Sequence, residues 1–247
     1  IPRKEVSTGA GHKDFKVEYD HNLSVEDDLN RRDFTINAMA EDLSTGKLVD
    51  PLGGRKDIKN RLIRITNPDS FKEDPLRMLR AIQFSARFEF ELEENTLESL
   101  KENVELINTI SAERIQEELN KLLLKAKYPS SGFRLMQKVG LLERILPELS
   151  QSVGVEQPGG YHAYDVFEHS IITADNAPRD LVIRLAALFH DISKPETKML
   201  VQDGATFYGH EKRGSRLTQK ILTRLRYSNQ IIDQVSLLVD KHMFTTG

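Results

Sequence analysis

The sequence predicts a mainly α-helical protein in which a short mixed α/β segment precedes two helical segments. From about residue 75 onward, apolar residues recur at the three- and four-residue spacing of amphipathic helices. Short alternating stretches typical of strands occur only in the first fifty residues. A polar stretch over residues 150–160 contains Pro158-Gly159-Gly160 and indicates a linker. We therefore expect an incomplete α/β segment over residues 1–62, a helical segment over 63–149 and a second helical domain over 150–247.

The first segment shows both strand and helix patterns. Residues 15–19 alternate apolar and polar side chains, as a half-buried strand does, and residues 47–49 form a second short strand candidate. Between them, residues 32–40 have the pattern of a helix. The turn-forming residues 50–54 then predict a boundary.

The helical segments have recognisable starts. Glu73-Asp74-Pro75 places acidic groups and a proline where a helix begins. Ser111 is expected to cap a helix that carries Ile115 and Leu119 on its apolar side. Further helices are expected over residues 95–107, 129–142, 165–176, 179–189, 212–225 and 229–242.

Composition narrows the class of protein. The 247 residues are 38% hydrophobic and 30% charged and include no cysteine, which excludes disulfides and thiolate metal sites and suits a cytoplasmic protein. No stretch reaches the roughly 18 apolar residues that a membrane span needs. A net charge of -3 argues against indiscriminate coating of nucleic acid. Residues 55–87 nevertheless contain nine basic and four acidic residues, either a local nucleic-acid surface or a solvated charged face.

Three motifs in order resemble one known family. Residues 28–40 contain RRDFTINAMA, residues 50–57 read DPLGGRKD, and residues 73–81 read EDPLRMLRA. Together they resemble the tRNA nucleotidyltransferases, the family of bacterial class II CCA-adding enzymes and poly(A) polymerases. The resemblance implies a remnant of a nucleotidyltransferase head, then a helical neck that selects nucleotides and binds RNA. It also implies that C and/or A is added to the 3′ end of tRNA from CTP and ATP, with Mg²⁺ as cofactor.

Asp74 and Arg77 have the chemistry to select a base. Three residues apart, they are expected to be neighbours on one helical face. A carboxylate only accepts hydrogen bonds and a guanidinium only donates them, so the pair complements the amino and ring-nitrogen edge of C and A. The alternative is a surface salt bridge. The resemblance further implies that Arg32 contacts the triphosphate, that Asp33 holds the ribose, and that Arg80 adds charge near the nucleotide.

The carboxylates that hold the catalytic metal ions in this family cannot be assigned. The family carries them as Asp-x-Asp after a glycine-rich turn, and neither is present in the sequence. Arg3 and Glu5 resemble the strand that follows that pair. Since the chain starts at Ile1 and stops at Gly247 after an apolar helical run, we expect both ends to be cut. We also expect this chain alone not to transfer nucleotides.

A second set of residues is rich in histidine. His169 is followed by His190-Asp191, His210 and His242, and this order resembles the HD superfamily of metal-dependent phosphohydrolases. The resemblance implies a helical HD domain with His169, His190, Asp191 and His210 as metal ligands and with Lys194 and His242 as accessory groups. Imidazole suits transition metals, and a carboxylate extends the choice to Mn²⁺ or Mg²⁺. Asp240 is either a further ligand or a surface residue.

Three functions therefore remain open from the sequence. The first is a tRNA nucleotidyltransferase that grips tRNA mainly through phosphates. The second is an HD phosphohydrolase that acts on nucleotides or on cyclic phosphate RNA ends. The third is a non-catalytic RNA-binding scaffold. The motifs do not distinguish CC, A, CCA or poly(A) addition, and they leave the identity of the HD metal and the oligomeric state open.

Overall fold

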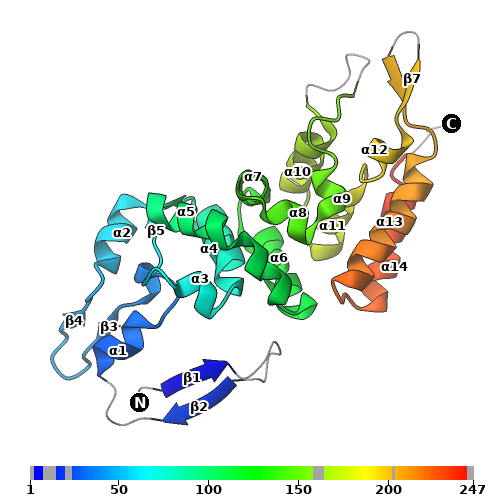
Figure 1. Ribbon diagram of the computed structural model, residues 1–247. Helices are drawn as coiled ribbons and strands as arrows, with labels where there is room; N and C mark the ends of the chain where they lie inside the picture. Colours follow the sequence, from blue (N-terminus) through cyan, green and yellow to red (C-terminus); the bar gives the residue numbers. More distant parts are fainter. Residues whose placement is uncertain (1–2, 8–14, 20–23, 158–163, 202–203, 244–247) are drawn as a thin grey trace. The chain divides into compact units, whose positions relative to one another are not determined.

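The computed structural model describes residues 3–7, 15–19, 24–157, 164–201 and 204–243 (Figure 1). Helices dominate, which confirms the mainly α-helical class. The chain forms two compact units, residues 1–115 and 116–247. Among the described residues, none of the helices combines the length and apolar character that crossing a bilayer requires.

In the described part of the first unit, the strands form three two-stranded sheets. Two sheets are antiparallel and join neighbours in the sequence, whereas the third is parallel and joins residues about thirty positions apart. The predicted strands at 15–19 and 47–49 are confirmed. The sheets are β1 (Arg3–Ser7) with β2 (Phe15–Tyr19), β3 (Ala40–Glu41) with β4 (Leu48–Val49), and β5 (Leu62–Ile63) with β6 (Glu91–Leu92).

The helix α4 (Leu76–Phe88) has a buried apolar side and contacts the strands β5 and β6. Leu76, Leu79 and Ile82 are buried as their spacing predicts, and Phe84 packs edge-on against the buried ring of Phe34 at 5.6 Å. The helices are α1 (Val25–Asn30), α2 (Gly54–Asn60), α3 (Ser70–Glu73), α4 (Leu76–Phe88) and α5 (Glu94–Asn103), with 3₁₀ turns η1 (Thr35–Asn37) and η2 (Val104–Thr109).

The prediction of a helix over residues 32–40 is wrong. Only η1 is helical there, and Phe34 instead forms an isolated antiparallel bridge with Ile65. The amide of Thr35 donates to the carbonyl of Arg64 at 2.9 Å. Pairing with residues 64–66 uses the backbone groups that a helix would need, so the tertiary contact overrides the local pattern.

The second unit is almost entirely helical. The helix α6 (Ala112–Lys125) crosses from the first unit, and Arg184 of α11 is buried with its guanidinium donating to the carbonyls of Leu123, Ala126 and Ala177. The other elements are α7 (Pro129–Val139), α8 (Leu141–Ile145), α9 (Pro147–Ser150), α10 (Val166–Asn176), α11 (Leu181–Phe189), α12 (Lys194–Thr197), β7 (Met199–Val201), β8 (Gly204–Thr206), α13 (His210–Arg224) and α14 (Asn229–Asp240).

Packing within this unit brings distant histidines together. Helix α11 packs against both α10 and α14, and α14 packs along α13 (Figure 1). Gly214 lies where α13 meets α14, because a Cβ there would lie 3.3 Å from Val239. The close approach of these helices assembles the metal-ligand candidates described below.

Candidate functional site

Asp33 and Arg80 form the firmest part of the predicted nucleotide site. Arg80 donates from Nε and Nη2 to Asp33 Oδ2 at 2.9 and 2.5 Å. The other oxygen, Oδ1, accepts from the amide of Phe34 at 2.8 Å and from Asn37 at 3.0 Å. The carboxylate is therefore held in one orientation next to α4, although the two residues are 47 positions apart.

Arg32 lies beside this pair and is about half exposed. Its guanidinium donates to Asp28 Oδ2 and to the carbonyl of Asn37, each at 3.3 Å. Burial alone would raise the pKa of Asp28, but hydrogen bonds from Arg31 and Arg32 outweigh it and lower that pKa. Within the described residues, the Arg32 guanidinium thus makes only these two long contacts and is about half exposed, which suits a residue expected to meet an anion.

Asp74 and Arg77 do not share a helical face, so that expectation is wrong. Asp74 has an extended backbone and precedes the first residue of α4, because the residue before a proline is disfavoured from the helical conformation. Its Oδ2 accepts from Arg114 at 2.9 Å. Arg77 instead donates to Ser70 Oγ at 2.8 Å and pairs with Glu73 at 3.0 Å.

Sequence reasoning missed Arg114. It lies 40 residues from Asp74, outside the three motifs, and no local periodicity links the two. The guanidinium is largely buried and fixes the carboxylate, while Leu76 donates its amide to the other oxygen at 3.2 Å. Each carboxylate oxygen has two lone pairs, so Asp74 retains capacity to accept from a ligand.

A buried network supports the segment that carries Arg32 and Asp33. Asp57 of α2 accepts from Thr35 Oγ1 at 2.6 Å and from Arg64 Nε at 2.9 Å. Gly54 makes the close approach possible, because a Cβ at this position would lie 2.1 Å from the carbonyl oxygen of Thr35. In the DPLGGRKD motif, Gly54 and Asp57 are therefore the residues that position residues 32–37.

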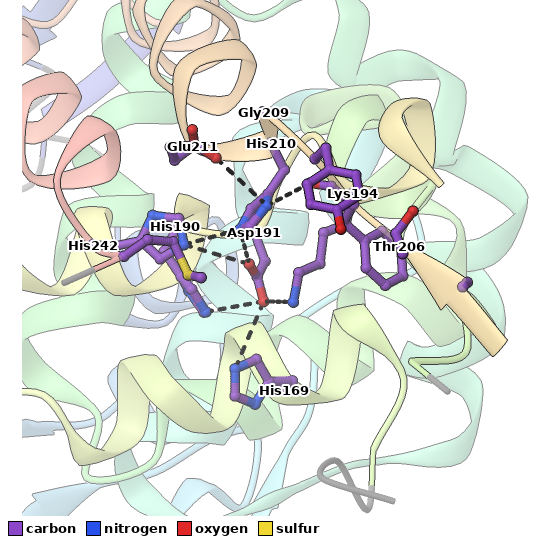
Figure 2. A pocket seen from close by; sticks show the side chains of 13 residues that line it. His169, His190, Asp191, Lys194, Thr206, Gly209, His210, Glu211 and His242 are labelled. Carbon is purple, nitrogen blue, oxygen red and sulfur yellow. Dashed lines mark hydrogen bonds and ion pairs between the residues drawn. The ribbon is translucent and has the colours of Figure 1, made fainter. Parts of the chain in front are cut away.

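The second candidate site is a cavity of about 580 Å³ in the second unit (Figure 2). The structure brings the other three predicted ligands and both accessory groups together around the buried Asp191. His169 comes from α10, His190 and Asp191 follow α11, His210 begins α13, and His242 follows α14.

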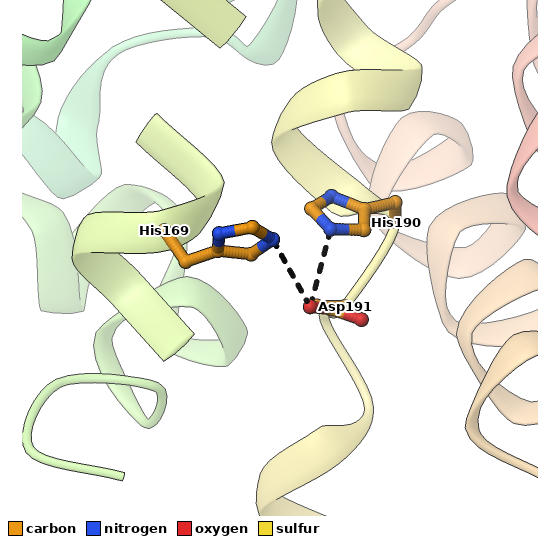
Figure 3. Close-up of side chains that lie close together, drawn as sticks. All are labelled: His169, His190 and Asp191. Atoms are coloured by element: carbon orange, nitrogen blue, oxygen red, sulfur yellow. Dashed lines mark ion pairs between the residues drawn. The ribbon is translucent and has the colours of Figure 1, made fainter. Parts of the chain in front are cut away.

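Each oxygen of Asp191 faces a different pair of imidazoles. Oδ2 lies 3.1 Å from Nε2 of His190 and 3.7 Å from Nε2 of His169 (Figure 3). Oδ1 lies 3.4 Å from Nε2 of His210 and 3.8 Å from Nε2 of His242. The two resulting groups of three, each with ligand atoms within 4.8 Å of one another, share Asp191.

The tautomers of three rings follow from their second contacts. Nδ1 of His190, His210 and His242 lies 2.8, 2.8 and 2.7 Å from a backbone carbonyl three residues earlier. A carbonyl only accepts, so Nδ1 carries a proton in each ring, and Nε2 either donates a second proton to Asp191 or offers a lone pair to a cation. Lone pairs facing a carboxylate are stable only with a proton or a cation between them. The donor set therefore fits divalent metal ions.

Lys194 lies on one side of this cluster. Its ammonium is 2.8 Å from Asp191 Oδ2, donates to Gln157 Oε1 at 2.6 Å and lies 5.3 Å from the centre of the Phe207 ring. Gln157 lies in the stretch predicted as a linker, and no sequence signal indicated this contact. Asp240 pairs with Lys241 at 3.0 Å and is outside both ligand groups, as a surface residue would be.

The charges around Asp191 shift the pKa values of the cluster. Burial alone would raise the pKa of Asp191, but hydrogen bonds from His190 and His210 and the charge of Lys194 hold it well below its ordinary value. Burial alone would lower the pKa of His210, but its bond to Asp191 raises it. Burial and the neighbouring histidines lower the pKa of His242. Unequal proton affinities among neighbouring groups are common in functional sites.

Three family models match the chain in sequence order. Residues 3–64 match the poly A polymerase head domain, residues 89–152 match the probable RNA and SrmB-binding site of polymerase A, and residues 159–246 match the HD domain. The chain belongs to the tRNA nucleotidyltransferase and poly(A) polymerase family and carries an HD domain.

Individual relatives agree with this assignment. The chain is 39% identical over 98% of its length to a Multifunctional CCA protein of Methylobacillus flagellatus, covering 59% of that protein. It is 38% identical over 89% of its length to an A-adding tRNA nucleotidyltransferase of Deinococcus radiodurans, covering 53% of it. The chain thus spans between half and three fifths of these relatives.

A solved structure shares the fold. The CCA-adding enzyme of Bacillus stearothermophilus in complex with CTP superposes with a TM-score of 0.63 and 26% sequence identity. The match covers 94% of this chain and 49% of that one.

Proposed function

We propose that this chain is the nucleotide-selecting and RNA-binding part of a tRNA nucleotidyltransferase that adds C and/or A to tRNA 3′ ends from CTP and ATP. The observation that supports it is the fixed charge arrangement around α4. Arg114 holds Asp74 just before the helix, and Asp33 holds Arg80 one turn further along it. Rigid acceptors and donors of this kind can distinguish bases without a template strand.

Asp74 is the group we assign to base selection. Its carboxylate can accept the amino group of cytosine or adenine, whereas uracil and guanine present a carbonyl oxygen at the equivalent position and would be repelled. By analogy with bidentate base contacts, the discrimination is roughly 1–3 kcal/mol for each well-placed pair. Arg32 and Arg80 then meet the triphosphate, Asp33 orients the ribose, and Mg²⁺ bound outside this chain's residues supplies charge neutralisation.

The experiment is nucleotide competition in the full-length enzyme. Asp74→Ala is expected to reduce the preference for CTP and ATP over UTP and GTP by about tenfold or more. Asp69→Ala is the control, because Asp69 is an exposed residue paired with Lys72 on the surface. Unchanged relative incorporation of all four nucleotides in Asp74→Ala contradicts the assignment. Arg77→Lys tests the second predicted residue and keeps the charge near Glu73 and Ser70.

tRNA is the proposed partner, bound through its phosphates by the helical segment in the cytoplasm. The match of residues 89–152 to an RNA-binding model supports this. Affinity should fall steeply with added salt, because each phosphate contact releases counterions. tRNA binding that never responds to CTP or ATP, even in the full-length protein, would instead indicate a scaffold.

The histidine cluster supports a second function, metal-dependent phosphohydrolysis of nucleotides or cyclic phosphate RNA ends. A bound divalent cation supplies Lewis-acid activation of the phosphate ester and of water. His169, His190, Asp191, His210 and His242 would hold it, and Lys194 would stabilise negative charge on the phosphate.

Phosphate release with added Mn²⁺ or Ni²⁺ tests this function. His190→Ala and Asp191→Ala should abolish release and reduce the bound metal measured by elemental analysis. His190 and Asp191 variants that keep full hydrolytic activity, or a protein that retains no divalent metal at saturating concentration, would refute it.

A further inference from the structure

We propose that Tyr208 is the base-stacking platform of the cavity around Asp191, so that this cavity selects nucleoside phosphates over small phosphate esters. The inference rests on the phosphohydrolase function proposed above and identifies the part of the site that recognises substrate.

The cavity is larger than a metal centre and a phosphate group require. Its volume of about 580 Å³ lies in the range of pockets that enclose whole small-molecule ligands. One wall is formed by the histidines, Asp191 and Lys194. The other comes mainly from residues 205–209, which are the end of β8 and the turn that leads into α13 (Figure 2). A ligand with a phosphate at the first wall would extend toward the second.

The two aromatic residues of the second wall have different surroundings. Phe207 is partly buried and lies against the ammonium of Lys194, so it supports that side chain. Tyr208 is 79% exposed and Met243 is 63% exposed, although both line the cavity. A tyrosine with this much ring surface open beside a cluster of polar groups offers a flat apolar surface for a ligand.

The backbone couples Tyr208 to the metal-ligand candidates. Gly209 has a φ of +74° and lies between Tyr208 and His210 at the start of α13. This left-handed turn costs little for glycine, and it allows the residues on both sides of it to line one cavity. The platform is thereby placed two residues from a group that faces Asp191.

Nucleobases are the ligand chemistry that fits these two walls together. A phosphate suits Lys194 and the cation site, and an aromatic base suits an exposed tyrosine ring. Stacking on an aromatic side chain accepts every base, since each has a π face, and removing one such side chain weakens binding by about tenfold. The same nucleoside phosphate could be a free mononucleotide or the 3′-terminal residue of an RNA.

The test measures binding as well as turnover in the whole chain with Mn²⁺. Dissociation constants are compared for adenosine 3′-phosphate, for a short RNA ending in a 3′-phosphate, and for glycerol 2-phosphate. Tyr208→Ala is expected to lower the preference for adenosine 3′-phosphate over glycerol 2-phosphate by about tenfold, and Tyr208→Trp to restore it. Tyr164→Ala is the control, because Tyr164 is half exposed and does not line the cavity.

Each outcome separates the platform from the hydrolytic function. An unchanged preference in Tyr208→Ala, or an equal loss for both ligands, overturns the proposal. Loss of nucleotide preference with no phosphate released from any ester leaves the platform standing and refutes the phosphohydrolase. A larger effect of Tyr208→Ala on the RNA than on the mononucleotide identifies an RNA end as the ligand, and the reverse identifies a free nucleotide.

Discussion

Replacing Asp57 by alanine should destabilise the first unit and loosen the segment that carries Arg32 and Asp33. The Asp57 side chain is only 6% exposed and accepts hydrogen bonds from Thr35 and Arg64. Its truncation leaves a buried hydroxyl and a guanidinium without their acceptor. The loss of these two hydrogen bonds weakens the support of the backbone that carries the candidate nucleotide site.

The expected loss follows from these contacts. Breaking a fully buried ion pair costs about 3–5 kcal/mol, but Arg64 is 36% exposed and keeps a bond to the carbonyl of Leu52 at 2.7 Å. Water can therefore replace part of what Arg64 loses, which reduces this contribution to about 2 kcal/mol. The buried Thr35 hydroxyl adds about 1 kcal/mol. We expect the free energy of unfolding to fall by about 3 kcal/mol.

Urea unfolding and hydrogen exchange measure the two parts of this prediction. Asp69→Ala should cost less than about 1 kcal/mol, because its partner Lys72 is exposed. Exchange in a peptide covering residues 32–40 should accelerate in Asp57→Ala and not in Asp69→Ala. If Asp57→Ala unfolds at the same urea concentration as Asp69→Ala, the network does not support the segment and the reasoning is refuted.

Three further predictions concern the second unit. A divalent metal at about one hundred times its dissociation constant should raise the Tm by about 5–10 °C, and chelation or His190→Ala should abolish the rise. The pKa of His210 is raised in the folded protein. Protonated His210 therefore stabilises the metal-free fold at pH values below its ordinary pKa, and this contribution is lost as the pH rises through the raised pKa. Metal binding near neutral pH should therefore release protons, seen calorimetrically as a heat that changes with the buffer; a heat independent of buffer contradicts this. Arg184→Met should cost about 2–4 kcal/mol by removing the donor to three helix-end carbonyls, against under 1 kcal/mol for the exposed Arg216→Met; equal Tm values would refute it.

The sequence predicted most of the helices because their signals are local. The start of α4 follows from Glu73-Asp74-Pro75, and α10 and α11 begin one or two residues from their predicted positions. The error at residues 32–40 arose because Phe34 pairs with Ile65. These two residues are too far apart for a pattern within a short stretch of sequence to show the pairing. The two-residue strands β5 and β6 have too few residues to show a period.

In the candidate sites too, residues that belong to a motif were predicted, whereas contacts that depend on packing were not. The motif resemblance named in advance the four histidines and the lysine that the structure places near Asp191. It did not predict that each oxygen of Asp191 faces its own pair of rings, which depends on how α10, α11, α13 and α14 pack. Arg114 and Gln157 went unnoticed because each meets its partner through the fold, at separations of 40 and 37 residues.

Two of the imidazoles take their orientation from where a helix stops. Ala187 and Val239 lie in the last turns of α11 and α14, where carbonyls have no amide of their own helix to accept from. Each of these carbonyls accepts a hydrogen bond from an imidazole Nδ1 and so orients the ring. The geometry of these two ligand candidates therefore depends on where each helix ends. A change that extended either helix by a residue or two could therefore weaken metal affinity while leaving every ligand in the sequence intact.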